Sequence, residues 1–97
     1  MITRIVRMEF REDAVAAFLE TFRKSENLIR NFEGCKSLQL MRDKENHRLY
    51  STVSVWENTE ALEKYRESVL FKETWAAAKK GFSSKPLAFT LVGDVRA

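Results

Sequence analysis

Aromatic side chains gather in one stretch of the sequence, residues 56–75, WENTEALEKYRESVLFKETW, which holds both tryptophans of the chain among charged residues. Tyr65 and Trp75 are ten residues apart. That spacing is close to three helical turns, so an unbroken helix places both rings on roughly one face. Such rings can stack against a flat aromatic ligand, while a phenol and an indole N–H supply polar anchors. Aromatic stripes at helical spacing also commonly form hydrophobic core, so the residue types indicate either a core or a pocket.

Other side chains that could do chemistry are few. His47 is the single histidine, and its ordinary pKa near neutrality would suit proton abstraction from a hydroquinone. It follows the polar run RDKEN, however, where an exposed histidine without a chemical role is expected. Cys35 is the single cysteine, and a small buried thiol explains it better than a nucleophile. One cysteine and one histidine cannot form a zinc site, so we predict no metal. We assign no general base from the sequence.

Length and composition indicate one globular domain over residues 1–97, with 44% hydrophobic and 32% charged residues. The 17 basic and 14 acidic residues are interspersed rather than gathered in a stripe, so we do not expect nucleic-acid binding. The N-terminal MITRIVRMEF alternates apolar and charged residues, unlike a signal peptide or a membrane span. We therefore expect a cytoplasmic protein without membrane contact.

Hydrophobic periodicity predicts six elements. They are a strand over 2–10, a helix from Asp13 to near Phe32, strands over 35–42 and 47–56, a helical region from Asn58 or Thr59 to about Gly81, and a strand over 87–95. The polar segment 43–46 has hairpin length, so the two middle strands should pair antiparallel. Ser68 can mark a kink in the second helical region. The order predicts a ferredoxin-like α+β fold, βαββαβ, with a four-stranded antiparallel sheet.

The third and fourth strands present two faces that both lack charge. If one face carries Leu49, Val53, Val55, Leu87, Phe89 and Leu91, the other carries Tyr50, Thr52, Ser54, Trp56, Ala88, Thr90 and Val92. A solvated face normally carries charges at alternate positions, so we expect the second, serine- and threonine-rich face to be covered by another subunit. These residue types are also good strand formers, which is the alternative explanation. The pattern predicts a homodimer.

The chain resembles the antibiotic biosynthesis monooxygenase family of dimeric α+β barrels over nearly its whole length. Two segments carry the resemblance: FEGC, which leads into the second strand, and VSVWENTEALEKYRESVLFKETW, where a strand-ending tryptophan precedes an acidic helix start and an LFKE segment. The order and spacing of these motifs support the resemblance more than any one of them does. It implies one of several activities: cofactor-free oxygenation of aromatic polyketides or quinols, isomerisation of a bacterial signalling sugar, or haem degradation.

The haem-degrading branch of that family aligns with this chain from Trp56 onward without a gap. The resemblance places a catalytic tryptophan at the position of Tyr65, the iron-binding histidine at the position of Trp75, and a catalytic asparagine near Val6 or Arg7. None of the three is kept, and an indole nitrogen has no lone pair free to bind iron. We therefore expect no haem degradation and predict that the protein uses no cofactor.

The pocket that this family uses, between the helices and the sheet, implies a place for the aromatic residues. We predict that Tyr65, Trp75, Phe71 and Phe22 line it and bind substrate, whereas Trp56 packs between sheet and helix. The leading prediction is a cofactor-independent monooxygenase of a small phenolic or quinol-like molecule, because such a substrate, once deprotonated, can itself deliver an electron to O₂. The alternative is a non-catalytic small-molecule-binding or stress-associated protein, which the absence of an obvious buried acid or base favours.

Overall fold

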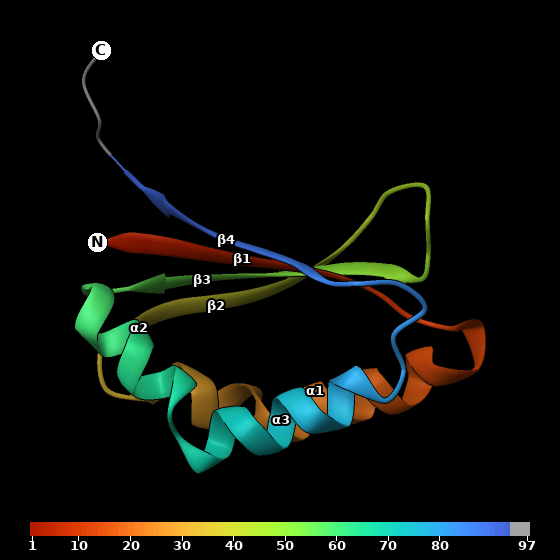
Figure 1. Ribbon diagram of the computed structural model, residues 1–97, viewed down its shortest axis with the longest axis horizontal. Helices are drawn as coiled ribbons and strands as arrows, with labels where there is room; N and C mark the ends of the chain where they lie inside the picture. The colour runs from red at the N-terminus through yellow and green to blue at the C-terminus, as the bar shows by residue number, and fades with distance from the viewer. Residues whose placement is uncertain (94–97) are drawn as a thin grey trace.

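The computed structural model describes residues 1–93. Its elements are β1 (Ile2–Glu9), the 3-10 turn η1 (Glu12–Ala14), α1 (Val15–Arg30), β2 (Cys35–Arg42), β3 (Leu49–Trp56), α2 (Thr59–Arg66), α3 (Val69–Lys79) and β4 (Leu87–Val92). The strands form one antiparallel sheet in the order β2-β3-β1-β4, and the α-helices lie on one side of it (Figure 1). No helix in this part of the chain is long and apolar enough to cross a membrane. The predicted ferredoxin-like α+β plan is confirmed.

The central strand β1 shows which residues face the helices. Ile2 and Met8 are buried, whereas Arg7 is exposed on the opposite face. Val6 lies opposite Thr52 of β3 and opposite Ala88 of β4. The even-numbered positions of β1, β3 and β4 therefore form the inward face of the sheet, under the helices, and the odd-numbered positions form its outer face.

The two faces of β3 and β4 are the reverse of our expectation. Ser54 and Trp56 are buried under the helices, with 7% and 0% of their surface exposed, so the serine- and threonine-rich face is the inward one. The outer face instead carries Leu87, Phe89 and Leu91, which are 56%, 38% and 49% exposed. A polar inward face is possible because the Trp56 indole N–H donates to the Ser54 hydroxyl at 2.9 Å, which satisfies the buried donor.

The second helical region is broken at Ser68, as predicted. The Ser68 hydroxyl accepts a hydrogen bond from the backbone N–H of Phe71 at 3.1 Å and so caps α3, as the Asn58 side chain caps α2. The break changes the helical phase. After the break, Val69 is 69% exposed and Leu70 packs against the core.

The start of the first helix also differs from the prediction. Asp13 lies within η1, and α1 begins at Val15 with no side-chain cap. The Asp13 carboxylate accepts a hydrogen bond from Arg11 Nε at 3.2 Å, so it is engaged outside the helix.

β1 ends one residue earlier than predicted, and two other strands are shorter by two residues or more. β3 begins at Leu49, because Asp43 accepts hydrogen bonds from two backbone N–H groups at 2.9 and 3.0 Å and turns the preceding residues into a loop. His47 therefore lies in this loop and not in a strand. β4 ends at Val92, and positions 94 and 95 of the predicted strand lie outside the described residues.

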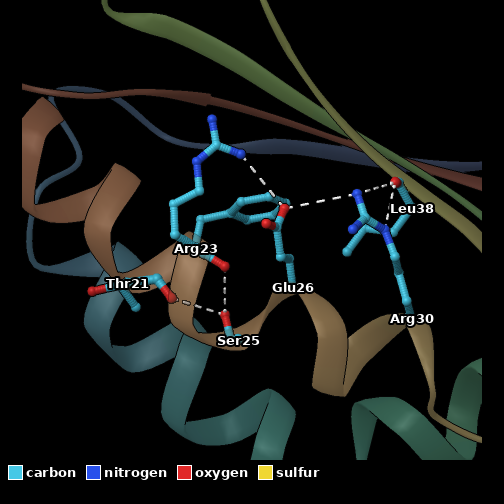
Figure 2. Close-up of polar contacts among 7 residues, drawn as sticks. Thr21, Arg23, Ser25, Glu26, Arg30 and Leu38 are labelled. Carbon is cyan, nitrogen blue, oxygen red and sulfur yellow. Dashed lines mark hydrogen bonds and ion pairs between the residues drawn. The ribbon is translucent and has the colours of Figure 1, made fainter.

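An arginine at the end of α1 joins that helix to β2 by hydrogen bonds. Arg30 donates from Nε and Nη2 to the backbone carbonyl oxygen of Leu38, at 3.3 and 3.2 Å (Figure 2). Glu26 lies between Arg30 and Arg23, with oxygen–nitrogen distances of 3.7 and 3.5 Å. The Glu26 side chain is only 18% exposed, and the two guanidinium groups compensate its charge. This arrangement fixes one wall of the space between helices and sheet.

Gly34 makes the connection between α1 and β2 possible. Its φ is 86°, and a Cβ added there would collide with the methyl group of Ala61 on α2. We expect Gly34→Ala to lower the free energy of unfolding by about 1–2 kcal/mol through the left-handed backbone conformation alone. The collision adds a further loss, and urea denaturation measures the sum.

A second substitution separates the two contributions. Ala61→Gly in the Gly34→Ala background should recover only the part that comes from the collision, because the backbone strain stays. Gly93→Ala is the matched control, since a Cβ added at Gly93 meets nothing within 4 Å. A Gly34→Ala variant as stable as the wild type would contradict the close approach of α2 to this turn.

Candidate functional site

A cavity of about 340 Å³ lies between the helices and the sheet. Inward residues of the sheet form its floor, and α1, α2 and α3 form its walls. The small side chains of Thr52, Ser54 and Ala88 leave this space open where larger apolar residues would fill it. Six aromatic rings line it: Phe18, Phe22, Trp56, Tyr65, Phe71 and Trp75.

The four predicted site residues all line this cavity. The ring of Phe71 lies between two of them: its centroid is 5.3 Å from that of Tyr65, edge-on at 79°, and 6.0 Å from that of Trp75, nearly parallel at 8°. Because the helix breaks at Ser68, Tyr65 lies in α2 and Trp75 lies in α3, so the two rings do not share one unbroken helical face. The ring of Phe71 lies next to both instead. Phe22 comes from α1. The structure brings the four together, and substrate binding by them stays a prediction.

Trp56 combines a packing role with a place in the cavity wall. It is fully buried, and its ring stacks on that of Tyr65 with centroids 4.9 Å apart and an interplanar angle of 26°. Its N–H is engaged by Ser54, so it offers the cavity only its ring. The half-buried Trp75 makes no hydrogen bond through its indole N–H within residues 1–93, and because no buried donor there lacks a partner, this N–H is accessible to solvent.

Tyr65 is a neutral hydrogen-bonding group. Burial raises the pKa of its phenol to about 12, although the nearby Thr74 hydroxyl acts in the opposite direction. At neutral pH the phenol therefore keeps its proton, so it can donate to a negatively charged ligand oxygen but cannot act as a general base.

His47 and Cys35, the other two candidates from the sequence, do not line the cavity. The His47 side chain is 63% exposed and its Nε2 lies 3.0 Å from Glu12 Oε1, so the only imidazole of the chain is on the surface. Within the described residues no histidine lines the cavity, and Trp75 lies there instead, so the site does not fit a haem with an axial histidine. Cys35 is partly buried, and burial raises the pKa of its thiol, which makes it a poor nucleophile.

Two arginines that were not predicted from the sequence, Arg4 and Arg66, also line the cavity. Arg4 occupies an inward position of β1, between Ile2 and Val6, and its Nη1 donates to the hydroxyl of Thr90 on β4 at 3.1 Å. The signal was present in the sequence, because a charge at an inward position of an alternating strand must have a partner or a ligand. In the described residues, the cavity lining contains no aspartate, glutamate, lysine or histidine.

The same fold occurs in solved structures of low sequence identity. One described as an antibiotic biosynthesis monooxygenase has a TM-score of 0.91 and 14% identity, and covers 98% of this chain and 100% of its own. Rv0793 from Mycobacterium tuberculosis has a TM-score of 0.89 and 19% identity, with coverages of 99% and 97%. A conserved protein from Methanosarcina mazei Go1 has a TM-score of 0.88 and 16% identity, with coverages of 94% and 91%. At these identities the likeness shows the fold alone.

Sequence comparison identifies the family. No curated protein matches the chain. The family model described as antibiotic biosynthesis monooxygenase matches residues 1–77 of the 97-residue chain. The matched part runs from β1 into α3 and includes all four predicted site residues. The chain therefore belongs to the antibiotic biosynthesis monooxygenase family.

Proposed function

We propose that this protein is a cofactor-independent monooxygenase that oxidises a small phenolic or quinol-like aromatic molecule with O₂. The aromatic cavity is the observation that carries the proposal. Its walls hold six aromatic rings, an available indole N–H and a neutral phenol, in a chain of the antibiotic biosynthesis monooxygenase family. Such a site can bind a reactive aromatic molecule, orient it and exclude water.

The reaction needs no external reductant when the ring carbon that is oxidised carries a hydrogen and lies ortho or para to the phenolic hydroxyl. Loss of the phenolic proton leaves an anion that shares its charge with that carbon and transfers one electron to O₂, and the two resulting radicals combine to form a carbon-bound peroxide. After protonation of the peroxide, the O–O bond and the C–H bond at that carbon break, and water leaves. One oxygen atom stays in the product as a carbonyl and the other becomes water, so the substrate supplies all four electrons.

The residues of the cavity have distinct roles in this proposal. Phe71 and Phe22 bind the faces and edges of the ring. The Tyr65 O–H and the Trp75 N–H donate to the oxygen atoms that become negatively charged as the substrate loses its proton. Because no described residue of the lining is a general base at neutral pH, the acidity of the substrate itself controls the rate. The pH dependence of turnover should follow the pKa of the substrate.

The same observation favours a second candidate function. A cavity without a base also suits a protein that binds an aromatic molecule and does not transform it, such as a carrier or a stress-associated binding protein. The two functions differ in whether O₂ is consumed once the ligand is bound.

We further infer that the protein is a homodimer that buries the outer face of the sheet. Val53, Ile5 and Phe89 lie in register across β3, β1 and β4, and Leu87 and Leu91 add exposed apolar surface beside them. A soluble chain rarely leaves an apolar patch of this extent exposed, and a second copy is the simplest cover. This places the subunit contact on the face opposite to the one that the sequence suggested.

Oxygen uptake tests the leading function. With a panel of hydroquinones and hydroxylated naphthalenes, the wild type should consume O₂ faster than each compound oxidises in buffer, and heat denaturation should abolish the difference. Saturable binding measured by calorimetry, without O₂ uptake for any member of the panel, would favour the binding protein.

Single substitutions test the site residues. Tyr65→Phe keeps the ring but removes the O–H, so turnover should fall roughly 5- to 10-fold, the effect of one hydrogen bond, while the melting temperature changes little. Trp75→Ala should weaken ligand binding by more than that. Val69→Ala, on the same helix as Trp75 but 69% exposed, is the control and should change neither. If all three variants bind the ligand as the wild type does, Tyr65 and Trp75 do not belong to the site.

Light scattering tests the dimer. The wild type at micromolar concentration should have twice the chain mass of 11.3 kDa. Phe89→Asp puts a charge on the outer face of β4 and should give a folded monomer, as judged by circular dichroism. Val92→Asp makes the same change on the same strand at an exposed inward position, and this control should stay dimeric. A monomeric wild type would contradict the inferred interface.

A further inference from the structure

One end of the cavity carries positive charge. Arg4 lies on the inward face of β1, near its start, and Arg66 is the last residue of α2, next to Tyr65. Figure 1 shows α2 over the end of the sheet where β1 begins. Because neither aspartate nor glutamate lines the cavity in residues 1–93, these two guanidinium groups have no acidic neighbour in the lining itself.

Arg4 is a partly buried cation that forms no close ion pair. No carboxylate of the described residues forms an ion pair with it. Burial lowers the pKa of Arg4, the charge of Arg66 lowers it further, and the charge of Glu63 acts in the opposite direction. A guanidinium stays charged at neutral pH in spite of such shifts, so Arg4 keeps a charge that solvent and the more distant Glu63 compensate in part, and it can take an anion as a direct partner.

The geometry of Arg4 leaves one edge of its guanidinium available. Its hydrogen bond to Thr90 uses Nη1. Within residues 1–93, Nε and Nη2 make no hydrogen bond, and together they form the side of the guanidinium that matches the two oxygens of a carboxylate. Arg66 pairs with Glu63 at 3.1 Å, but the two side chains are 42% and 49% exposed, and such surface pairs are weak. Arg66 can therefore turn toward a ligand at modest cost.

We propose that the cavity binds an aromatic carboxylate, whose carboxylate group pairs with Arg4, with Arg66 beside it, while its ring lies between the aromatic walls. This substrate class rests on the proposed function as a site for aromatic molecules. A carboxylate provides a counter-charge in direct contact and a planar pair of acceptors for Nε and Nη2. The cavity of about 340 Å³ is at the small end of ligand pockets, so the ligand has one ring or two fused rings.

Calorimetry with a matched pair of ligands tests the proposal. The probes are 1-hydroxy-2-naphthoate and its methyl ester, which share the ring and differ in the charge. The wild type should bind the acid roughly 10- to 100-fold more tightly than the ester, the usual effect of a hydrogen-bonded charge pair. Arg4→Gln should abolish this preference while leaving the affinity for the ester unchanged. Arg42→Gln removes the same charge from an exposed position at the end of β2, outside the cavity lining, and this control should keep the preference.

A further variant separates a ligand-binding role of Arg4 from a purely structural one. Thr90→Val removes the hydrogen bond that joins Arg4 to β4 and keeps the guanidinium. It should keep the preference for the acid. If Thr90→Val and Arg4→Gln both lose the preference and both melt at a lower temperature, Arg4 only ties β4 to β1 and the proposal is wrong. Equal affinity of the wild type for acid and ester would overturn it as well.

Oxygen uptake with the same two compounds distinguishes failure of the carboxylate site from failure of the proposed monooxygenase activity. Arg4-dependent binding of the acid without O₂ uptake supports the carboxylate site and rejects the monooxygenase. Oxidation of the ester as fast as the acid, by both the wild type and Arg4→Gln, supports the monooxygenase and rejects the carboxylate site.

Discussion

The burial of Trp56 is the interaction on which the rest of the site depends. This last residue of β3 is completely buried, with Tyr65 stacked against it at 4.9 Å and Phe32 edge-on at 6.4 Å. A buried indole requires an acceptor for its N–H, and Ser54, two residues earlier on the same face of the strand, supplies one. The contact holds α2 over the end of the sheet, and α2 in turn brings Tyr65 and Arg66 to the cavity.

The layer between the helices and the sheet has a filled part and an open part. In the filled part, Phe10 is completely buried and stacks on Phe18 at 4.1 Å. In the open part, Thr52 and Ala88 lie on either side of Val6 and leave space above them. Larger apolar residues at those two positions would bury more surface and stabilise the fold. Positions that lack such burial are typical of functional sites, where less complete packing leaves space for a ligand.

The sequence predicted the order and type of the elements because each keeps a clear period and clear end signals. The start of α2 at Asn58 or Thr59 and an interruption at Ser68, for example, were both predicted, although the capping role of Ser68 was not. Which face of the sheet the helices cover could not be read, because both faces of β3 and β4 lack charge. Hydropathy favoured placing Phe89 on the inward face, whereas the cavity requires small residues at the inward positions of β4. Arg4 was missed because the apolar residues at alternate positions of β1 were taken as the pattern of a buried face, and the charged residue among them was not considered.

The strand β4 links the cavity to the outer face. All of its residues are exposed in the isolated chain, which is unusual for a strand that pairs with the centre of a sheet. Its inward residues include Ala88, which lines the cavity, and Thr90, which holds Arg4, while Phe89 between them points outward. In the proposed dimer, a partner that packs against Phe89 would fix the position of β4 and with it the position of Ala88 in the cavity wall. The inferred interface and the cavity are therefore coupled through one strand, and dimerisation would order that part of the wall as well as bury apolar surface.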